Sequence, residues 1–275
     1  REILTRLRVP VAPARGGIGI IETSIGKMVP SASPPGLGKS SPLDIAAEAY
    51  STLIVDRTNW VGSFPDVDGL WGVESIQAYV DRKLFIHNFG HAAAAYLGAL
   101  EAPDARYIAE VVTIPAVLRE VRGVMMQSAE ALAAEYPDDL SFHELTTHVE
   151  DLLLRFGNPY LYDTLVRVGR DLPRKLSRDD RVVGAMRLLA RHGLELDQAA
   201  RVYHGALRFN PACVGHDTVA GASTEALLPE DLSLKEDLAV HGLSYVLERY
   251  SGLGISAAGM DAAVRRAILN AAGTS

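Results

Sequence analysis

The chain has a single cysteine, Cys213, and this excludes an internal disulfide framework. It also lacks an unbroken apolar run of about 20 residues and a charged-then-apolar leader, which together predict a cytoplasmic protein without a membrane anchor. We interpret Cys213 as a structural thiol, because neither a basic group nor a helix start is indicated around it.

Positive charge is not in excess either. The formal net charge is −7, which argues against nucleic acid or a membrane surface as a partner. Hydrophobic residues make up 48% of the 275 positions, enough for one large or two modest cores. We therefore expect a compact protein whose partner is a small molecule, and the oligomeric state stays open.

A dinucleotide-binding unit is not visible in the sequence. Such a unit needs a strand, a G-x-G-x-x-G turn opening a helix, and an acid about 20 residues later. The run from Gly17 to Glu22 lacks the third glycine and is predicted to be a strand. The run from Gly36 to Ser40 resembles the tail of a phosphate loop, but Ser33 stands where the first glycine belongs. We interpret residues 31–41 as a loop.

Two parts of the chain differ in pattern. Residues 1–71 are predicted to be a small α/β segment with two strands, at Gly17–Thr23 and Ser51–Arg57, around a Pro/Gly/Ser loop. Residues 72–275 are predicted to be all-helical. The expected helices are Glu74–Leu100, one starting at Asp104, Pro115–Tyr136, Ser141–Phe156, Arg178–His192, Leu196–Phe209, Leu234–Tyr250 and Ile255–Ala271. The fold class is therefore predicted to be mainly α, a helical bundle preceded by a small β-containing segment.

Lys83, Asn88 and His91 place an amine, an amide and an imidazole on one helical segment. In a continuous α-helix at about 100° per residue, the three side chains fall within an arc of roughly 140°. A lysine with a lowered pKa can take a proton from an alcohol, and the amide and imidazole can hydrogen-bond an oxyanion. The pattern predicts an alcohol dehydrogenase that uses no metal.

Each of these residues also has a structural reading. Asn88 could be a buried amide bonded to a neighbouring backbone group. His87 is interpreted as a packing residue or as a residue that supports the site from behind, since only one of two nearby imidazoles can face the same side. Metal catalysis is the alternative mechanism. His143 and His148 are five residues apart, and this spacing does not put both rings on one helical face, where they could bind the same metal ion.

The pattern Lys83-x4-Asn88-x2-His91 resembles the polyol-specific long-chain dehydrogenases, and more closely the mannitol-1-phosphate 5-dehydrogenases among them. A second segment, Arg155–Leu176, is similar to the other signature of that family. The resemblance implies that Lys83 is the general base, that Asn88 and His91 form the oxyanion hole, and that NAD is the cofactor, with no metal. It also implies a helical domain like the C-terminal domain of 6-phosphogluconate dehydrogenase.

Two departures from the family stand out. Gly26 and Lys27 occupy positions where the family usually has Asp-Arg before a Met/Ile-Val-Pro turn, so we expect a polar contact to the substrate or to a neighbouring loop to be missing. The family's N-terminal dinucleotide-binding domain is also not visible. We therefore expect the chain to be the C-terminal part of a longer enzyme, inactive alone, with residues 1–71 as a remnant or edge of a Rossmann-type cofactor domain.

Cationic side chains crowd the second segment. Arg170, Arg174 and Lys175 are favoured as an anion site, because they lie beside the breaks at Gly169 and Pro173, and a buried phosphate needs charge-assisted partners. The equally weighted alternative is a solvated face, paired with acids of the same segment: Asp171, Asp179 and Asp180.

The function expected from these residues is an NAD-dependent polyol phosphate dehydrogenase that interconverts mannitol 1-phosphate and fructose 6-phosphate. An enzyme acting on a free polyol or a hexuronate, of the mannitol 2-dehydrogenase or fructuronate reductase type, remains open. A non-catalytic helical module for binding or oligomerisation is the alternative of another class. The sequence makes no choice between NAD and NADP.

Overall fold

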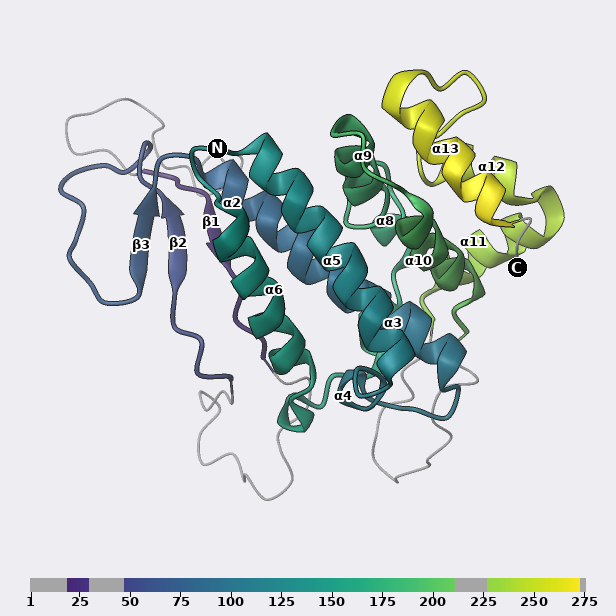
Figure 1. Cartoon of the computed structure of the whole chain (residues 1–275), viewed down its shortest axis with the longest axis horizontal. Helices are drawn as coiled ribbons and strands as arrows, with labels where there is room; N and C mark the ends of the chain where they lie inside the picture. The colour runs from purple at the N-terminus through teal and green to yellow at the C-terminus, as the bar shows by residue number, and fades with distance from the viewer. Residues whose placement is uncertain (1–18, 30–46, 211–226, 273–275) are drawn as a thin grey trace, which may run out of the picture.

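The fold is a bundle of helices with a small sheet at one side (Figure 1). The computed structural model describes residues 19–29, 47–210 and 227–272. The predicted fold class, a mainly α-helical bundle preceded by a small β-containing segment, is confirmed. None of the helices in the described ranges is long and apolar enough to span a membrane.

The sheet consists of β1 (Thr23–Ile25), β2 (Leu53–Asp56) and β3 (Leu70–Val73), in the order β1-β2-β3. β1 runs antiparallel to β2, whereas β3 runs parallel to it. The described part of residues 1–71 holds no helix, unlike the α/β segment that we expected. β3 also spans the boundary placed after residue 71, so the sheet continues into the second segment.

One of the two predicted strands matches the structure, and the other overlaps it at a single residue. β2 lies inside the predicted strand at 51–57. β1 shares only Thr23 with the predicted strand at 17–23, whose first two residues lie outside the described ranges, as do the loop at 31–41 and Cys213.

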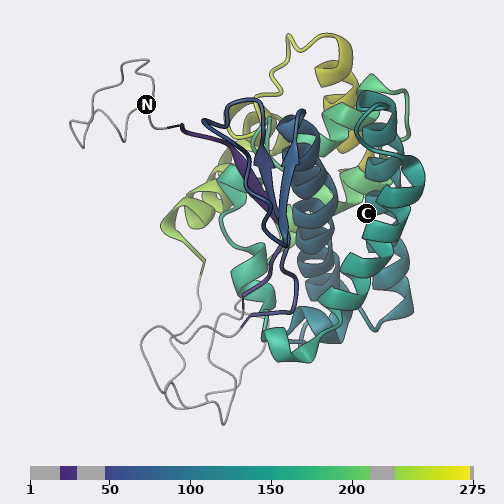
Figure 2. The same ribbon diagram turned by 90° about the vertical axis from the view of Figure 1, so that its left-hand side faces the viewer.

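A long helical rod forms the centre of the bundle. It comprises α2 (Ile76–Arg82), the π-helix η1 (Lys83–Asn88) and α3 (Phe89–Glu101), and it covers nearly the whole of the helix predicted at 74–100. Seen from the side of the strands, the sheet lies in front of this rod (Figure 2). α5 (Pro115–Glu135) packs along α3, and α6 (Phe142–Phe156) packs along α5.

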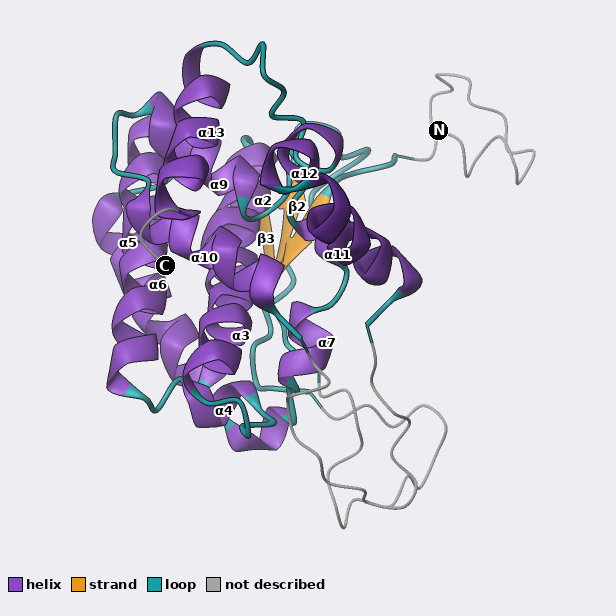
Figure 3. Cartoon of the chain, turned by 90° about the vertical axis from the view of Figure 1, so that its right-hand side faces the viewer, coloured by secondary structure: helices purple, strands orange, loops and turns teal. Residues whose placement is uncertain are grey.

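The remaining helices (Figure 3) are α4 (Ile108–Val111), the 3₁₀ helix η2 (Pro159–Leu161), α7 (Leu165–Gly169), α8 (Leu172–Lys175), α9 (Val183–Arg191), α10 (Asp197–Arg208), α11 (Pro229–His241), α12 (Leu243–Arg249) and α13 (Gly259–Ala271). Of these, α4 and α9 to α13 follow the predicted order with shifted boundaries, whereas η2, α7 and α8 lie between residues 156 and 178, where no helix was predicted. The single helix predicted at 234–250 is broken at Gly242, whose φ of 79° suits a residue without Cβ.

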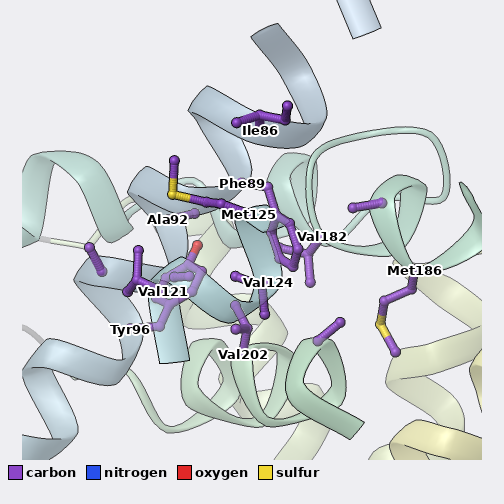
Figure 4. Packing of buried hydrophobic residues seen from close by; sticks show 14 of the residues in the cluster. Ile86, Phe89, Ala92, Tyr96, Val121, Val124, Met125, Val182, Met186 and Val202 are labelled. Carbon is purple, nitrogen blue, oxygen red and sulfur yellow. The ribbon is translucent and has the colours of Figure 1, made fainter. Parts of the chain in front are cut away.

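The core lies where α3 meets α5 and α10 (Figure 4). Ala92 to Ala95 are fully or almost fully buried, so small side chains let the neighbouring helices approach α3 closely. Tyr96 is also buried, and its hydroxyl donates a hydrogen bond to the carbonyl of Gly169 at 3.0 Å. This bond ties the rod to the end of α7.

Arg155 on α6 connects the helices to the strand segment. Its Nε donates to Oε2 of Glu48 at 2.9 Å, and its Nη2 donates to the carbonyl of Gly26 at 2.5 Å. The side chains of Arg155 and Glu48 are only 13% and 8% exposed. The hydroxyl of Ser24 in β1 donates to the carbonyl of Tyr79 in α2 at 3.2 Å. The sheet segment therefore packs on the bundle through polar as well as apolar contacts.

Candidate active site

The segment that carries Lys83 and Asn88 is a π-helix rather than the α-helix assumed from the sequence. A π-helix hydrogen-bonds residue i to residue i+5, and such turns inside α-helices occur often at functional sites. Lys83 and Asn88 are five residues apart, so they stand one π-turn apart on the same side of the rod. His91 follows in α3, three residues after Asn88, where neighbours on a helix surface meet.

Lys83 is half-buried in a setting that disfavours its charge. Burial lowers the pKa of its ammonium, and the guanidinium of Arg181 lowers it further. Arg181 belongs to the turn before α9, and that turn packs against η1. Gly184, at the start of α9, has no Cβ, and the ring of Phe85 in η1 occupies the space that a Cβ would need. Lys83 therefore releases its proton more readily than an exposed lysine, as a general base must.

Asn88 is partly buried, and within the described residues its amide makes no hydrogen bond. The structural reading, in which the amide is bonded to a neighbouring backbone group, is therefore not observed there. A partly buried amide without a protein partner is suited to bind a ligand oxygen.

His91 is held by two neighbours. Its Nε2 lies 3.0 Å from Oδ2 of Asp163, and its ring stacks on Phe156 with centroids 4.8 Å apart and planes 10° apart. Burial, together with the charges of Arg167, Lys175 and Arg181, lowers the pKa of His91 to about 3. The imidazole is therefore neutral near pH 7.

Asp163 precedes α7 and is fixed by its own backbone. Its carbonyl accepts a hydrogen bond from the N–H of Ile108 at 2.8 Å, beside the isolated bridge between Tyr107 and Thr164. Its Oδ1 forms an ion pair with Arg167, one helical turn further on. The carboxylate thus lies between an imidazole and a guanidinium.

His87 has the packing role assigned to it. It is buried, and its ring lies 5.7 Å from that of Phe156 and 6.2 Å from that of His91. Burial lowers the pKa of His87 well below the usual histidine value. His148, half-buried on α6, has a pKa lowered to about 3 by burial and by two nearby arginines. In the described ranges, no group of three or more His, Cys, Asp or Glu side chains is arranged to hold a metal ion.

The cations predicted as an anion site are mostly engaged within the protein. We use the name basic segment for residues 167–181. Lys175 is 4% exposed, and its Nζ donates to the carbonyls of Val168, at 2.5 Å, and Arg170. Burial lowers the pKa of Lys175 to about 7. Arg174 pairs with Asp171 at 2.5 Å and with Asp180 at 3.3 Å.

Other arginines of the basic segment also face carboxylates. Arg178 pairs with Asp261 at 2.6 Å, and Arg181 pairs with Asp180 at 2.8 Å. Arg170 differs, since its side chain forms no ion pair with the described residues. The solvated face weighed as an alternative thus describes Arg174 and Arg178, whereas Lys175 belongs to the interior.

A pocket of about 310 Å³ opens between α2, α5 and α9, beside Leu84 and Phe85 of the π-helix. Lys83, Asn88 and His91 are not among the residues that line it. We predict that the head groups of these three residues border one open cavity, and this pocket does not test that prediction.

A family model described as the mannitol dehydrogenase C-terminal domain matches residues 75–222, just over half of the chain. This chain belongs to the mannitol dehydrogenase family. The resemblance drawn from its two sequence segments is thereby confirmed at the level of the family. The matched range contains Lys83, Asn88 and His91 together with the whole basic segment, while α11 to α13 lie beyond it.

Two solved structures share the fold of this mannitol dehydrogenase domain. One is the Pseudomonas fluorescens mannitol 2-dehydrogenase in a ternary complex with NAD and D-mannitol, at 21% identity and a TM-score of 0.54, with 84% of this chain and 46% of that chain covered. The other is a D-sorbitol dehydrogenase in substrate-free form, at 12% identity and a TM-score of 0.57, with 81% and 53% covered. The chain spans about half the length of each.

Asp163, Arg181 and Phe156 of this family member were not singled out from the sequence. Asp163 and Arg167 are four apart, the spacing of an ion pair on one helix face, and this signal was available. The contact between Asp163 and His91 joins residues 72 positions apart, which a single sequence does not reveal. Phe156 ends an apolar helix face and is indistinguishable there from any core residue.

Proposed function

We propose that this chain is the substrate-binding and catalytic part of an NAD-dependent dehydrogenase that interconverts a polyol and a ketose. One observation carries the proposal: a desolvated lysine stands one π-turn from an amide that has no partner among the described residues, and three residues further on is a neutral imidazole. In this proposal Lys83 accepts the hydroxyl proton, and Asn88 and His91 bind substrate oxygen atoms.

The role of Lys83 follows from its surroundings. A general base works best when its pKa lies near the working pH. Burial and Arg181 both lower the pKa of Lys83, so a larger share of this amine is neutral than in an exposed lysine. The neutral amine accepts the proton of the alcohol, and the ammonium returns it when a ketone is reduced.

The described residues contain no strand, glycine turn and helix of the kind that anchors NAD. The helix that follows β3 begins after Glu74 and Ser75, without the glycine turn that cradles a pyrophosphate. No residue of this chain is therefore assigned to the cofactor, and no step is derived through it. NAD is proposed because the mannitol 2-dehydrogenase of the same fold was solved with it. We expect no saturable NADH binding by the 275-residue chain in calorimetry.

We propose a free polyol of the mannitol or sorbitol type as the substrate, instead of the mannitol 1-phosphate expected from the sequence. A buried phosphate needs several free cations. Lys175 donates to two carbonyls and Arg174 pairs with two carboxylates, so both would have to leave their partners. The names of the two solved structures are those of enzymes for free polyols. Arg170 is the one observation that favours the phosphorylated substrate.

The test uses the full-length enzyme in which this chain is joined to its cofactor-binding part. NADH formation is measured with D-mannitol, D-sorbitol, mannitol 1-phosphate and a hexonate at equal concentrations. Turnover of a free polyol that depends on Lys83 supports the proposal. Preference for the phosphorylated substrate would overturn the choice of substrate, and turnover that is unchanged in Lys83→Ala would overturn the assignment of the site.

A further inference from the structure

Asp163 and His91 form a close contact that satisfies the distance of an ion pair but not the angle of a hydrogen bond, so Nε2 is buried without a hydrogen-bond partner among the described residues. Oδ2 of the carboxylate lies 3.0 Å from Nε2 of the imidazole, and the side chains are 8% and 14% exposed. The carboxylate itself is immobilised by the backbone bond from Ile108 and by the ion pair from Arg167 to its other oxygen. Because so little of either group is open to solvent, water does not readily replace this contact.

Asp163 fixes the edge of the imidazole that carries Nε2, and a second neighbour fixes the plane of the ring. The ring of Phe156 stacks on it in a nearly parallel arrangement, and the ring of His87 lies 6.2 Å away. A partial rotation of the His91 ring would break the stack, and a 180° flip would keep the stack but remove Nε2 from Asp163. The two neighbours together restrict the ring to one orientation.

This arrangement decides where the imidazole carries its proton. A neutral imidazole has one N–H and one lone pair, and the nitrogen that faces an anionic carboxylate carries the hydrogen. The cations around the ring, Arg167, Lys175 and Arg181, together with burial, keep the second nitrogen unprotonated by lowering the pKa of His91 to about 3. Nε2 is therefore the donor of the ring and Nδ1 its acceptor.

We propose that Asp163 is the positioning residue of the site, holding His91 as the Nε2–H tautomer so that Nδ1 accepts a hydrogen bond from a substrate hydroxyl. The inference rests on the proposed function and deepens it. A polyol carries a hydroxyl on the carbon next to the reacting one, and Nδ1 of His91 accepts a hydrogen bond from that hydroxyl, which keeps its proton. Hydrogen bonding to the developing oxyanion then falls to the amide of Asn88, not to His91 as the sequence indicated.

The tautomer is measured by nitrogen-15 NMR of the histidine rings in the labelled 275-residue chain. The chain has 8 histidines, and His91→Gln assigns the resonances of His91. We expect the proton on Nε2 and a lone pair on Nδ1 near pH 7. In Asp163→Asn, which keeps the shape of the side chain, the preference for this tautomer is lost.

The chain offers a matched control. Nε2 of His192 lies 2.8 Å from Oε2 of Glu135, between the end of α5 and the end of α9. Glu135→Gln should change the ring resonances of His192 and leave those of His91 as they were. A wild-type chain with the proton on Nδ1 of His91 would overturn the proposal, and this result needs only the assignment variant, not a folded Asp163→Asn.

A second result would also overturn it. If Asp163→Asn folds, as judged by an unchanged circular dichroism spectrum, and keeps the Nε2–H tautomer in full, then Asp163 does not set it. The proposed function is decided separately, by the turnover of Lys83→Ala in the full-length enzyme. The expected tautomer together with a fully active Lys83→Ala enzyme would remove the proposed function and leave the positioning of His91 intact.

Discussion

The π-helical segment η1 and the basic segment differ in how their polar groups are balanced. In η1, Lys83 and Asn88 have no ion pair or hydrogen bond from their side chains to the described residues, and the charge that most affects Lys83 has the same sign. In the basic segment, Arg174, Arg178 and Arg181 face carboxylates. The region rich in charge is the one that is internally neutralised.

The difference shows that the number of charges in a stretch of sequence is a poor guide to a ligand site. A paired cation has already exchanged its water for a carboxylate, and an exposed pair of this kind contributes little free energy. A polar group that is desolvated without a partner is less stable, and a ligand can relieve this. Residues of the second kind mark the candidate site.

The largest effect is expected at Lys83. In the full-length enzyme, Lys83→Ala should lower kcat by about 10²–10⁴-fold near neutral pH, the usual contribution of a positioned general base. The matched control is Lys235→Ala on α11, another half-buried lysine whose pKa is lowered by burial. Steady-state kinetics give the result. A loss below about tenfold with an unchanged pH profile would take the base role from Lys83.

A pH-dependent stability difference is expected from Lys175. Its pKa is about 7 in the folded chain, compared with about 10.4 for a free lysine. Between these values the unfolded chain binds more protons, so the free energy of unfolding rises with pH. The free energy of unfolding of the wild type minus that of Lys175→Met should therefore rise by about 1–4 kcal/mol from about pH 7 to about pH 10. Urea denaturation at several pH values measures it, and a flat difference would mean that Lys175 stays charged.

A smaller effect is expected at Arg170 when two substrates are compared. If the basic segment is no phosphate site, Arg170→Gln changes the KM for D-mannitol and the KM or inhibition constant for mannitol 1-phosphate by similar factors. Arg178→Gln, which alters an arginine bound to Asp261, is the control. A loss specific to the phosphorylated compound of about 1.5–3 kcal/mol, the size of a charge-assisted hydrogen bond, would make Arg170 a phosphate ligand.

The smallest effect is expected at Arg174, whose side chain is 51% exposed. Arg174→Gln should change the free energy of unfolding by less than about 1 kcal/mol, because surface ion pairs are screened by solvent. Thermal and urea unfolding of the two chains give the comparison. A larger loss would show that the pairs with Asp171 and Asp180 are structural.

Helix periodicity predicted the rod and most of the later helices, because their apolar faces repeat at helical spacing along the sequence. The helix predicted at Ser141–Phe156 matches α6, whose start is fixed by a capping box of Ser141 and Glu144. The π-turn was not predicted, since residues 83–88 are compatible with either hydrogen-bond pattern. β3 was missed because a strand of four residues, Leu70–Val73, depends on parallel pairing with β2.

For the site, the sequence indicated residue types but not their partners. The acids that neutralise the basic segment include Asp261, which lies 83 positions from Arg178. Lys175 was favoured as an anion ligand because nothing local shows that its Nζ points inward to the carbonyl of Val168. Tertiary packing decides both outcomes, whereas the grouping of Lys83, Asn88 and His91 was visible as spacing along one helix.

The π-turn in the rod rotates the side chains of α3 about the helix axis relative to those of α2. On its N-terminal side, α2 presents Tyr79 to the strands, where its ring meets Trp71 at 5.2 Å. On its C-terminal side, α3 presents Ala92 to Ala95 to the core. Removing one residue from residues 83–88 would restore α-helical bonding and rotate one half against the other by about 100°. The sheet and the core could then not both keep their contacts, so the extra residue sets the angular relation between the strands and the bundle.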